Sequence, residues 1–310
     1  MTALRQPVVV DQFGIGTLRP APRSGVDLVR EDADPDRQVD TLGGEERELA
    51  LPIETSRRDR RVRQPVECDI VEDVVARAWI VLMDRLGYKR YVAQGGDWGN
   101  AVTEQMALLQ PPGLIGIHTN MPATVPAEIN AAALAGAPTP PGLSADEKHA
   151  YEQLAFFYKQ GLGYAQEMMN RPQSIYGIGD SPVGMAAWMI DHDASSYALI
   201  ARVFDGQPEG LTRDDILDNV TLYWLTNTAI PSARLYWESK LAFFAPKNVP
   251  IPAAVSAFAE ELYQAPRSWT EKAYPKLIHY NRLPKGGHFA AWEQPEYLVS
   301  ELRAGFKSLR

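Results

Sequence analysis

Residues 90–99 read Arg-Tyr-Val-Ala-Gln-Gly-Gly-Asp-Trp-Gly, and this stretch decides the fold. A run typical of a buried strand leads into Gly95-Gly96-Asp97-Trp98-Gly99, and a helix-like run follows at residues 100–109. Glycines at these spacings predict a sharp strand-to-helix turn with a nucleophile at its centre. Here the central residue is Asp97, and a carboxylate in that position can attack carbon and form an ester. The same residues are also compatible with a glycine-rich turn whose Asp caps the next helix.

The sequence on either side of this turn predicts an α/β fold. Apolar spacing predicts a helix at 74–86, a strand at 91–94, a helix at 101–109 and a strand at 114–119. This order is typical of a parallel sheet with crossover helices. Further along the chain, we expect strands at 253–258 and 276–283 and a closing helix at 297–309.

Residues 122–245 lose the strand pattern and predict a mostly helical insertion. Thr212 is a suitable N-cap, because Asp214 and Asp215 follow it in the first turn. The helices predicted in this region cover residues 145–160, 181–190, 195–203, 212–226 and 230–244. We therefore expect a first part of the core at 76–121, a helical cap at 122–245 and a second part of the core at 246–310.

The first 75 residues differ in composition from the rest of the chain. They hold one aromatic residue, Phe13, eleven Arg and no Lys, and acidic and basic residues crowd together in them. Such a segment struggles to bury enough apolar surface to offset its ordering entropy. We expect residues 1–75 to be atypical and poorly ordered, with a weak N-terminal layer as the alternative. Residues 7–10, Pro-Val-Val-Val, could form a short strand, but the sequence shows no clear partner for it.

The composition of the 310-residue chain excludes several classes of protein. Its net charge of -8 argues against a nucleic-acid binder, which would normally carry a basic surface. No apolar run reaches the ~18 residues that a membrane span needs. A single cysteine, Cys68, excludes an internal disulfide and a multi-cysteine metal site. The first residues show no basic region followed by an apolar one, so we expect no secretory signal and a cytoplasmic protein.

A nucleophilic carboxylate needs a base that activates water and an acid that orients the base. Histidine suits the first role because it titrates near neutral pH. His288 follows the strand predicted at 276–283 and lies in a glycine loop, Lys285-Gly286-Gly287-His288. Glu260 and Glu261 follow the strand predicted at 253–258, and the sequence alone leaves open which of them is the acid. The order nucleophile, acid, histidine is that of α/β-hydrolases.

Four stretches of the chain carry a resemblance to a known family. From about residue 76 to 310 the chain resembles an epoxide hydrolase of the α/β-hydrolase superfamily, in the branch that includes the microsomal-type enzymes. The stretches occur in the family's order, and together they are far more specific than any one alone. They are Gln94-Gly-Gly-Asp-Trp-Gly99, Asp180-Ser-Pro-Val-Gly-Met-Ala-Ala-Trp188, Phe258-Ala-Glu-Glu-Leu-Tyr-Gln-Ala-Pro-Arg-Ser-Trp269 and Gly286-Gly-His-Phe-Ala-Ala-Trp292.

The resemblance implies a role for five residues. Asp97 would be the nucleophile, Glu261 rather than Glu260 the acid, and His288 the base that activates water. Tyr164 and Tyr236, in the cap, would hydrogen-bond the epoxide oxygen. The expected reaction uses a small-molecule epoxide and water, forms a vicinal diol, and needs no metal or organic cofactor.

One part of the family pattern is absent from the sequence. Negative charge on the carbonyl of the Asp97 ester needs backbone N–H donors, of which Trp98 would supply one. The family supplies another from a His-Gly-x-Pro segment, but no histidine precedes His118 here. The N-terminal strands of the family are not recognisable either. We expect residues 1–75 to derive from a shifted reading frame, a truncation or a mis-set gene start, with impaired activity as one consequence.

Two other functions stay open on the sequence. A haloalkane dehalogenase uses the same Asp, His and acid logic and often a Trp beside the nucleophile, as Trp98 is here. The tyrosine pair favours an epoxide, because halide release needs halide-stabilising N–H donors instead. The chain could also be an inactive remnant that only binds ligands or partners.

Overall fold

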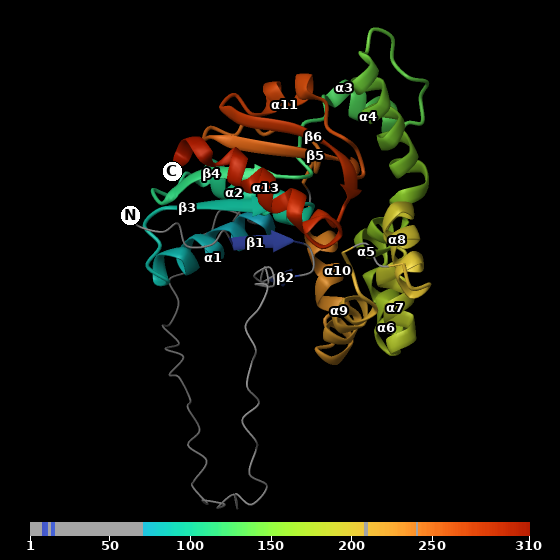
Figure 1. The fold of residues 1–310 in the computed structure, drawn as a ribbon. Helices are drawn as coiled ribbons and strands as arrows, with labels where there is room; N and C mark the ends of the chain where they lie inside the picture. The colour runs from blue at the N-terminus through green and yellow to red at the C-terminus, as the bar shows by residue number, and fades with distance from the viewer. Residues whose placement is uncertain (1–7, 12–13, 16–70, 208–209, 240) are drawn as a thin grey trace, which may run out of the picture. The chain divides into compact units, whose positions relative to one another are not determined.

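The computed structural model describes residues 8–11, 14–15, 71–207, 210–239 and 241–310. Within this part, six strands form one sheet in the order β2-β1-β3-β4-β5-β6 (Figure 1). All neighbouring pairs are parallel except β1 and β2, which are antiparallel. The strands are β1 (Val8–Asp11), β2 (Gly14–Ile15), β3 (Tyr91–Gly95), β4 (Leu114–Thr119), β5 (Ala253–Glu260) and β6 (Leu277–Gly287).

Helices cover both faces of this sheet. Tyr91 and Ala93 of β3 belong to a buried cluster with side chains of α1 and α2, whereas Val92 packs against the cluster of α13. This alternation follows from the two-residue period of a strand and explains why Tyr91, Val92 and Ala93 are all apolar. The core helices are α1 (Val71–Arg85), α2 (Trp98–Leu109), α11 (Arg267–Ala273), α12 (Ala290–Glu293) and α13 (Pro295–Gly305), which a 3₁₀ turn at Lys307–Leu309 follows.

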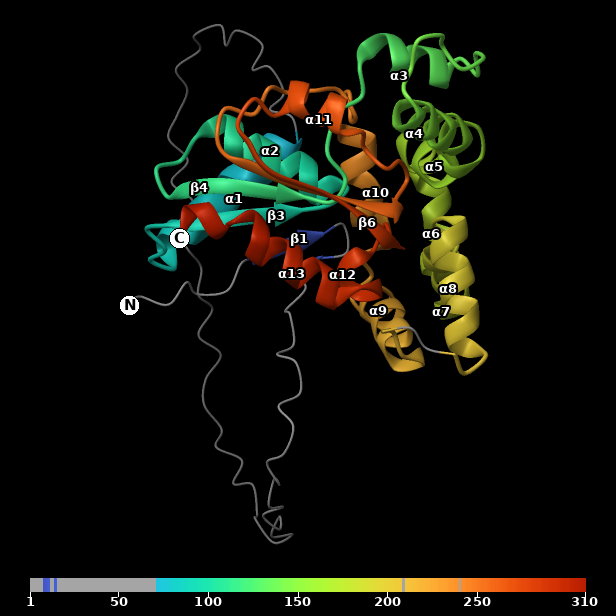
Figure 2. The same cartoon turned by 45° about the horizontal axis from the view of Figure 1, so that its top comes forward.

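A helical cap is inserted between β4 and β5. Its two best-defined starts are capping boxes, in which Ser144 pairs with Glu147 and Thr212 pairs with Asp215. Figures 1 and 2 show the cap helices at the end of the sheet toward which the strand arrows point. They are α3 (Ala127–Leu134), α4 (Ala145–Phe156) with a π-helical turn at Phe157–Gly161, α5 (Gly163–Asn170), a 3₁₀ turn at Pro172–Ser174, α6 (Ile175–Gly179), α7 (Pro182–Ile190), α8 (Ala194–Phe204), α9 (Arg213–Leu225) and α10 (Ala229–Glu238).

The structure confirms the predicted α/β-hydrolase-like parallel sheet and corrects some of its details. The strand suggested at residues 7–10 does have a partner, because β1 pairs in parallel with β3. The helix predicted at 230–244 ends at Glu238, since Ser239 takes an extended conformation. Most of the segment 1–75 that was expected to be poorly ordered lies outside the described residues.

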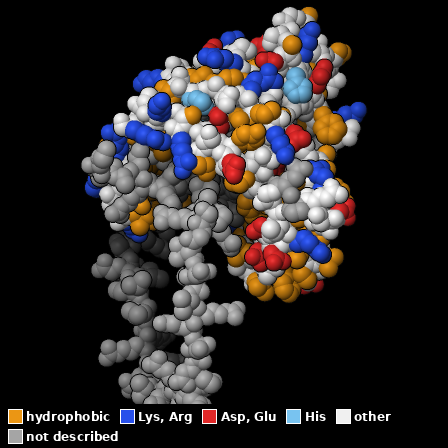
Figure 3. Space-filling view, viewed as in Figure 1, with side chains coloured by type: hydrophobic (Ala, Val, Ile, Leu, Met, Phe, Trp, Pro, Cys, Tyr) orange, Lys and Arg blue, Asp and Glu red, His pale blue; other side chains and the backbone are white. Residues whose placement is uncertain are grey.

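One surface of the cap is rich in exposed hydrophobic side chains. Hydrophobic side chains gather at the end of the cap where α6, α7 and α9 lie (Figure 3). A cluster of this kind differs from the single exposed apolar residues that are normal on protein surfaces. Its most exposed members are Tyr176, Val183, Leu222 and Leu225.

None of the described helices combines the length and the apolar character that crossing a bilayer would require.

Candidate active site

The turn at Asp97 has the backbone geometry of a nucleophile elbow. Asp97 links β3 to α2 with φ 49° and ψ -127°, a left-handed conformation that non-glycine residues rarely adopt. The neighbouring glycines make room for it. A Cβ on Gly95 would lie 2.1 Å from the Gly99 carbonyl oxygen, and one on Gly96 would lie 2.7 Å from Asn120 Oδ1. The tight turn therefore requires glycine at both positions.

The Asp97 carboxylate meets His288 and a backbone donor. Its Oδ2 lies 2.9 Å from His288 Nε2, and its Oδ1 accepts a 2.6 Å hydrogen bond from the Trp98 N–H. On the other side of the imidazole, Nδ1 lies 2.6 Å from Glu261 Oε1. The structure thus brings together Asp97 after β3, Glu261 after β5 and His288 after β6. Parallel strands make this possible, because their carboxyl ends lie at one edge of the sheet.

Glu261 rather than Glu260 faces the histidine. The Glu260 side chain is exposed at the end of β5, whereas Glu261 is 3% exposed. Besides His288, the Glu261 carboxylate accepts hydrogen bonds from the Leu262 N–H and, at 3.3 Å, from Asn120 Nδ2. These donors hold the carboxylate in one orientation and stabilise its charge.

The charges around His288 control its protonation. Burial by itself disfavours the imidazolium, but the carboxylates of Glu261 and Asp97 outweigh it and hold the pKa of His288 well above its usual value. The two carboxylates therefore favour the imidazolium form of His288. Loss of the Asp97 charge removes one of the two groups that sustain this pKa.

Tyr164 and Tyr236 come from the cap and face the elbow. Their ring centroids lie 6.0 Å apart, and Tyr236 packs edge-on against Trp98 at 5.0 Å. Both tyrosines are partly exposed, but their hydroxyl groups are buried in the protein. Burial of the hydroxyl, with the negative charge of Asp97 as a further cause, raises the pKa of both phenols well above 10. Both phenols are consequently protonated, and each has an O–H to donate.

His192 is the residue of this site that the sequence analysis did not identify. Its ring stacks on His288 with centroids 4.5 Å apart and an interplanar angle of 21°. Its Nδ1 lies 2.9 Å from Asp193 Oδ2, and its Nε2 lies 3.2 Å from the Tyr164 hydroxyl. The sequence contains only a weak indication of His192. Asp193 precedes Ser196 by three residues and so indicates the start of a helix, but nothing in the sequence shows that this helix begins beside His288.

The other histidines of the chain do not take part in this site. His118 is buried against Ser256, His279 pairs with Glu301, and His149 lies exposed on α4. Among the described residues, Asp97, His192 and His288 offer possible metal-ligating atoms within 4.8 Å of one another. Each of the three already has a hydrogen-bonding partner within the site.

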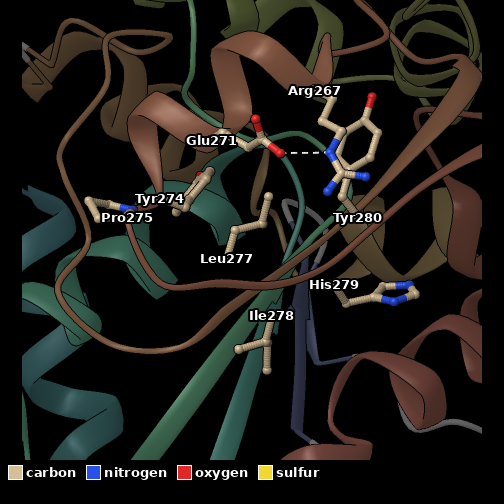
Figure 4. A pocket seen from close by; sticks show the side chains of 8 residues that line it. All are labelled: Arg267, Glu271, Tyr274, Pro275, Leu277, Ile278, His279 and Tyr280. Carbon is tan, nitrogen blue, oxygen red and sulfur yellow. Dashed lines mark hydrogen bonds and ion pairs between the residues drawn. The ribbon is translucent and has the colours of Figure 1, made fainter.

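A hollow of about 420 Å³ lies away from the elbow, between α11 and β6 (Figure 4). Arg267 and Glu271 form an exposed ion pair at its edge, and His279 is held by Glu301. None of these groups contacts Asp97 or His288. The hollow therefore has no part in the chemistry of the elbow.

Comparisons with known proteins give relatives over three quarters of the chain. A candidate epoxide hydrolase of Stigmatella aurantiaca is 45% identical over 240 residues, which are 76% of this chain and 51% of that protein. Epoxide hydrolase 1 of Oryctolagus cuniculus is 32% identical over 243 residues, which are 73% of this chain and 53% of that protein. The chain thus spans about half the length of the curated relatives it matches. No family model matches the chain.

Solved structures agree with this relationship. The juvenile hormone epoxide hydrolase of the silkworm Bombyx mori has a TM-score of 0.62 at 28% identity, over 77% of this chain and 59% of that one. An epoxide hydrolase of Aspergillus niger has a TM-score of 0.61 at 27% identity, over 80% of this chain and 60% of that one.

Proposed function

We propose that this chain, which belongs with the epoxide hydrolases of the α/β-hydrolase fold over the residues that match them, opens an epoxide to a vicinal diol. The observation that carries the proposal is the convergence of two kinds of group on one site. Asp97, backed by His288 and Glu261, is a nucleophile of the core, and the two phenols of the cap are acids that face it. A strained ether needs both at once.

Ring opening uses Asp97, Tyr164 and Tyr236. The Asp97 carboxylate attacks an epoxide carbon, the carbon–oxygen bond breaks, and an ester forms. The leaving oxygen stays attached through the second carbon and receives a proton from a phenol. The phenols suit this role because a raised pKa keeps the O–H bond intact until an alkoxide, a far stronger base, develops beside it.

Hydrolysis of the ester uses His288, Glu261 and Trp98. Once Asp97 is an ester its negative charge is gone, so the pKa of His288 falls and the ring can accept a proton from water. Glu261 orients the ring and stabilises the imidazolium that forms. The Trp98 N–H, which already contacts the Asp97 carboxylate, stabilises the oxyanion as water attacks.

The end of β1 lies close to the elbow. Val10 of β1 pairs with Gly95, so the carboxyl end of β1 lies beside the elbow. The Trp98 N–H is the oxyanion donor that the proposed mechanism uses, since the sequence lacks the His-Gly-x-Pro segment. We also propose the division into a core at 76–121 and 246–310 and a cap at 122–245.

A haloalkane dehalogenase is the second candidate, and one observation favours it. The Trp98 indole Nε1 is buried beside the nucleophile, next to the Tyr236 ring. An N–H in this position beside the nucleophile could hold a leaving halide. The phenol pair favours the epoxide, because a halide leaves without needing a proton. Turnover of styrene oxide but not of a bromoalkane is the expected result.

The direct test compares the wild type with Asp97→Asn on styrene oxide. We expect the variant to lose turnover by a factor of about 10⁴ or more, because the attacking carboxylate is gone. Asp205→Asn, an exposed carboxylate of the cap, is the matched control and should retain full activity. Equal turnover by Asp97→Asn and the wild type would rule out the nucleophile. A wild type that melts cooperatively yet turns over no epoxide would instead indicate a remnant that only binds.

The proposed reaction draws on protein groups and water, without a metal or organic cofactor. We further propose that the protein works in the cytoplasm, where its single cysteine, Cys68, would stay reduced.

A further inference from the structure

We infer that His192 is a proton-relay residue that resupplies Tyr164 with a proton during ring opening. This inference rests on the proposed function and adds to it a cap residue outside the Asp97, Glu261 and His288 set. It also assigns the neighbouring Asp193 the role of orienting His192.

The geometry places His192 between the base and the acid. One face of its ring stacks on His288 at 4.5 Å, and its Nε2 lies 3.2 Å from the Tyr164 hydroxyl. The Tyr164 ring itself lies 4.8 Å from the His192 ring. His192 is 9% exposed, and Phe289 packs against it at 5.2 Å. The imidazole is thus shielded from bulk water and in hydrogen-bond reach of a group whose proton the reaction consumes.

Asp193 fixes the orientation of this imidazole. As N-cap of α8, its carboxylate accepts hydrogen bonds from the Ser196 N–H at 2.9 Å and the Ser196 hydroxyl at 2.6 Å. Burial would raise the pKa of Asp193, but the hydrogen bonds from His192 and Ser196 reverse that effect and lower it. The ionised carboxylate accepts the His192 Nδ1–H, so Nε2 is directed at Tyr164.

Ring opening consumes the hydroxyl proton of Tyr164, so another group must supply a proton to the Tyr164 oxygen. In ring opening the Tyr164 O–H bond breaks and an O–H forms on the alkoxide. In the same step His192, in its imidazolium form, gives its Nε2 proton to the phenolic oxygen, so that no free phenolate builds up. His288, which loses its Asp97 counter-charge in the same step, releases a proton that returns to His192 through a water molecule. In hydrolysis His288 takes a proton from the attacking water, so the cycle closes without net gain or loss.

Several carboxylates face His192. Asp193 lies on its own turn, Asp97 lies across the site on the elbow, and Glu261 lies behind His288. Three carboxylates therefore surround two imidazoles. The remaining titratable neighbours are the Tyr164 and Tyr236 phenols, which are neutral, and Glu293, whose carboxylate accepts the Gly287 and Phe289 N–H groups.

A double-mutant cycle with separated reaction steps tests the relay. His192→Phe keeps an aromatic ring on His288 and removes both nitrogens, and Tyr164→Phe removes the acceptor of the proton. In single turnovers, followed by the tryptophan fluorescence to which Trp98 beside Asp97 contributes, we expect His192→Phe to slow ring opening by up to about 10-fold, no more than Tyr164→Phe does, and to leave ester hydrolysis unchanged. In the Tyr164→Phe background the same substitution should have no further effect. His149→Phe, on the exposed face of α4, is the control.

Three results would overturn the inference: ring opening at the wild-type rate in His192→Phe, effects that multiply in the double variant, or a loss confined to hydrolysis. The last would mean that His192 only packs on His288.

A second measurement does not depend on turnover. In ¹⁵N-histidine spectra we expect Tyr164→Phe to shift the His192 side-chain nitrogen signals and to leave those of His118 and His279 in place. Unshifted His192 signals would show that the contact is absent and would overturn the relay. If the wild type turns over no epoxide but Tyr164→Phe still shifts the His192 signals, the proposed function is contradicted. The contact between His192 and Tyr164 is then still present.

Discussion

The core and the cap each present a carboxylate–imidazole pair to the site, but they build it differently. In the core, Glu261 and His288 are 27 residues apart and follow two neighbouring strands, so the sheet sets their 2.6 Å contact. In the cap, His192 and Asp193 are adjacent, and the start of α8 sets their contact. In the proposed mechanism the sheet holds the group that attacks carbon, whereas the groups that transfer a proton to the oxygen belong to helices of the cap.

The two regions also differ in what surrounds their polar groups. A buried chain of hydrogen bonds supports the core pair: Gln94 donates to Asn120, which donates to Glu261. The cap phenols pack instead on an apolar cluster that contains Ile175 and Met185. Directional bonds thus hold the Glu261–His288 pair of the core, whereas the phenols of the cap rest on apolar packing and on the contact between Tyr164 and His192.

The largest expected effect comes from removing the base of the core. His288→Gln should reduce steady-state turnover by about 10⁴ or more, because water attacks the ester without a base. The ester should accumulate, since Asp97 remains able to attack once. Intact-mass measurement after mixing with styrene oxide should show one substrate mass added per chain. An unmodified chain would contradict the assignment of His288 to hydrolysis.

Removing the acids of the cap should have a smaller effect. Tyr164→Phe and Tyr236→Phe should each lower the rate of ring opening about 10-fold, because one phenol remains, and the double variant should lose about 10²- to 10⁴-fold. Hydrolysis of the ester should keep its rate. Tyr176→Phe, 66% exposed on α6, is the control. Single-turnover kinetics that show slower hydrolysis instead would contradict the division of labour between cap and core.

Matched packing variants sharpen the comparison further. Ile117 in β4 and Ile175 in the cap are both fully buried. Truncating either to Val should lower the free energy of unfolding by about 0.5–1.5 kcal/mol. Ile117→Val should leave kcat/KM unchanged, whereas Ile175→Val should lower it a few-fold, since the phenols pack on the same cluster. Denaturant titration and initial rates measure the two effects, and equal kcat/KM values would show that packing in the cap does not position the phenols.

The smallest effect concerns the pH dependence of the core. Burial lowers the pKa of His118 to about 3, against 6.5 when unfolded, so the folded state binds the proton more weakly. Below pH 6.5 the unfolded chain takes up this proton first. The free energy of unfolding should therefore decrease as the pH is lowered below 6.5, through this group by at most about 1.4 kcal/mol per pH unit. His118→Gln should remove this part of the slope between pH 6.5 and 4.5, and an unchanged slope would contradict it.

Local patterns in the sequence predicted much of the fold and of the core site. The elbow could be read because glycine spacing and the strand-to-helix change are properties of neighbouring residues. Glu260 and Glu261 could not be separated by local pattern, because the strand end exposes one and turns the other inward. The resemblance to the family distinguished them, and the hydrogen bond to His288 agrees with that choice.

Contacts between distant segments account for what the sequence did not show. The partner of β1 is β3, some 80 residues away, and no periodicity reports such a pairing. Helix α10 ends at Glu238, and the chain after it runs back to the core, where Phe243 packs against Trp98 and Phe244 packs against Tyr263. His192 joins the site only because α8 begins beside His288. The secondary-structure propensity of neighbouring residues contains no information on contacts between such distant segments.

A single turnover in ¹⁸O-water tests the ester at Asp97 most directly. With enzyme in excess over styrene oxide, the diol should take its new oxygen from the unlabelled Asp97 carboxylate. The peptide that contains Asp97 should then gain one ¹⁸O. Labelled diol together with an unlabelled Asp97 peptide would mean that water attacks the epoxide directly, and would contradict the role of Asp97 as nucleophile.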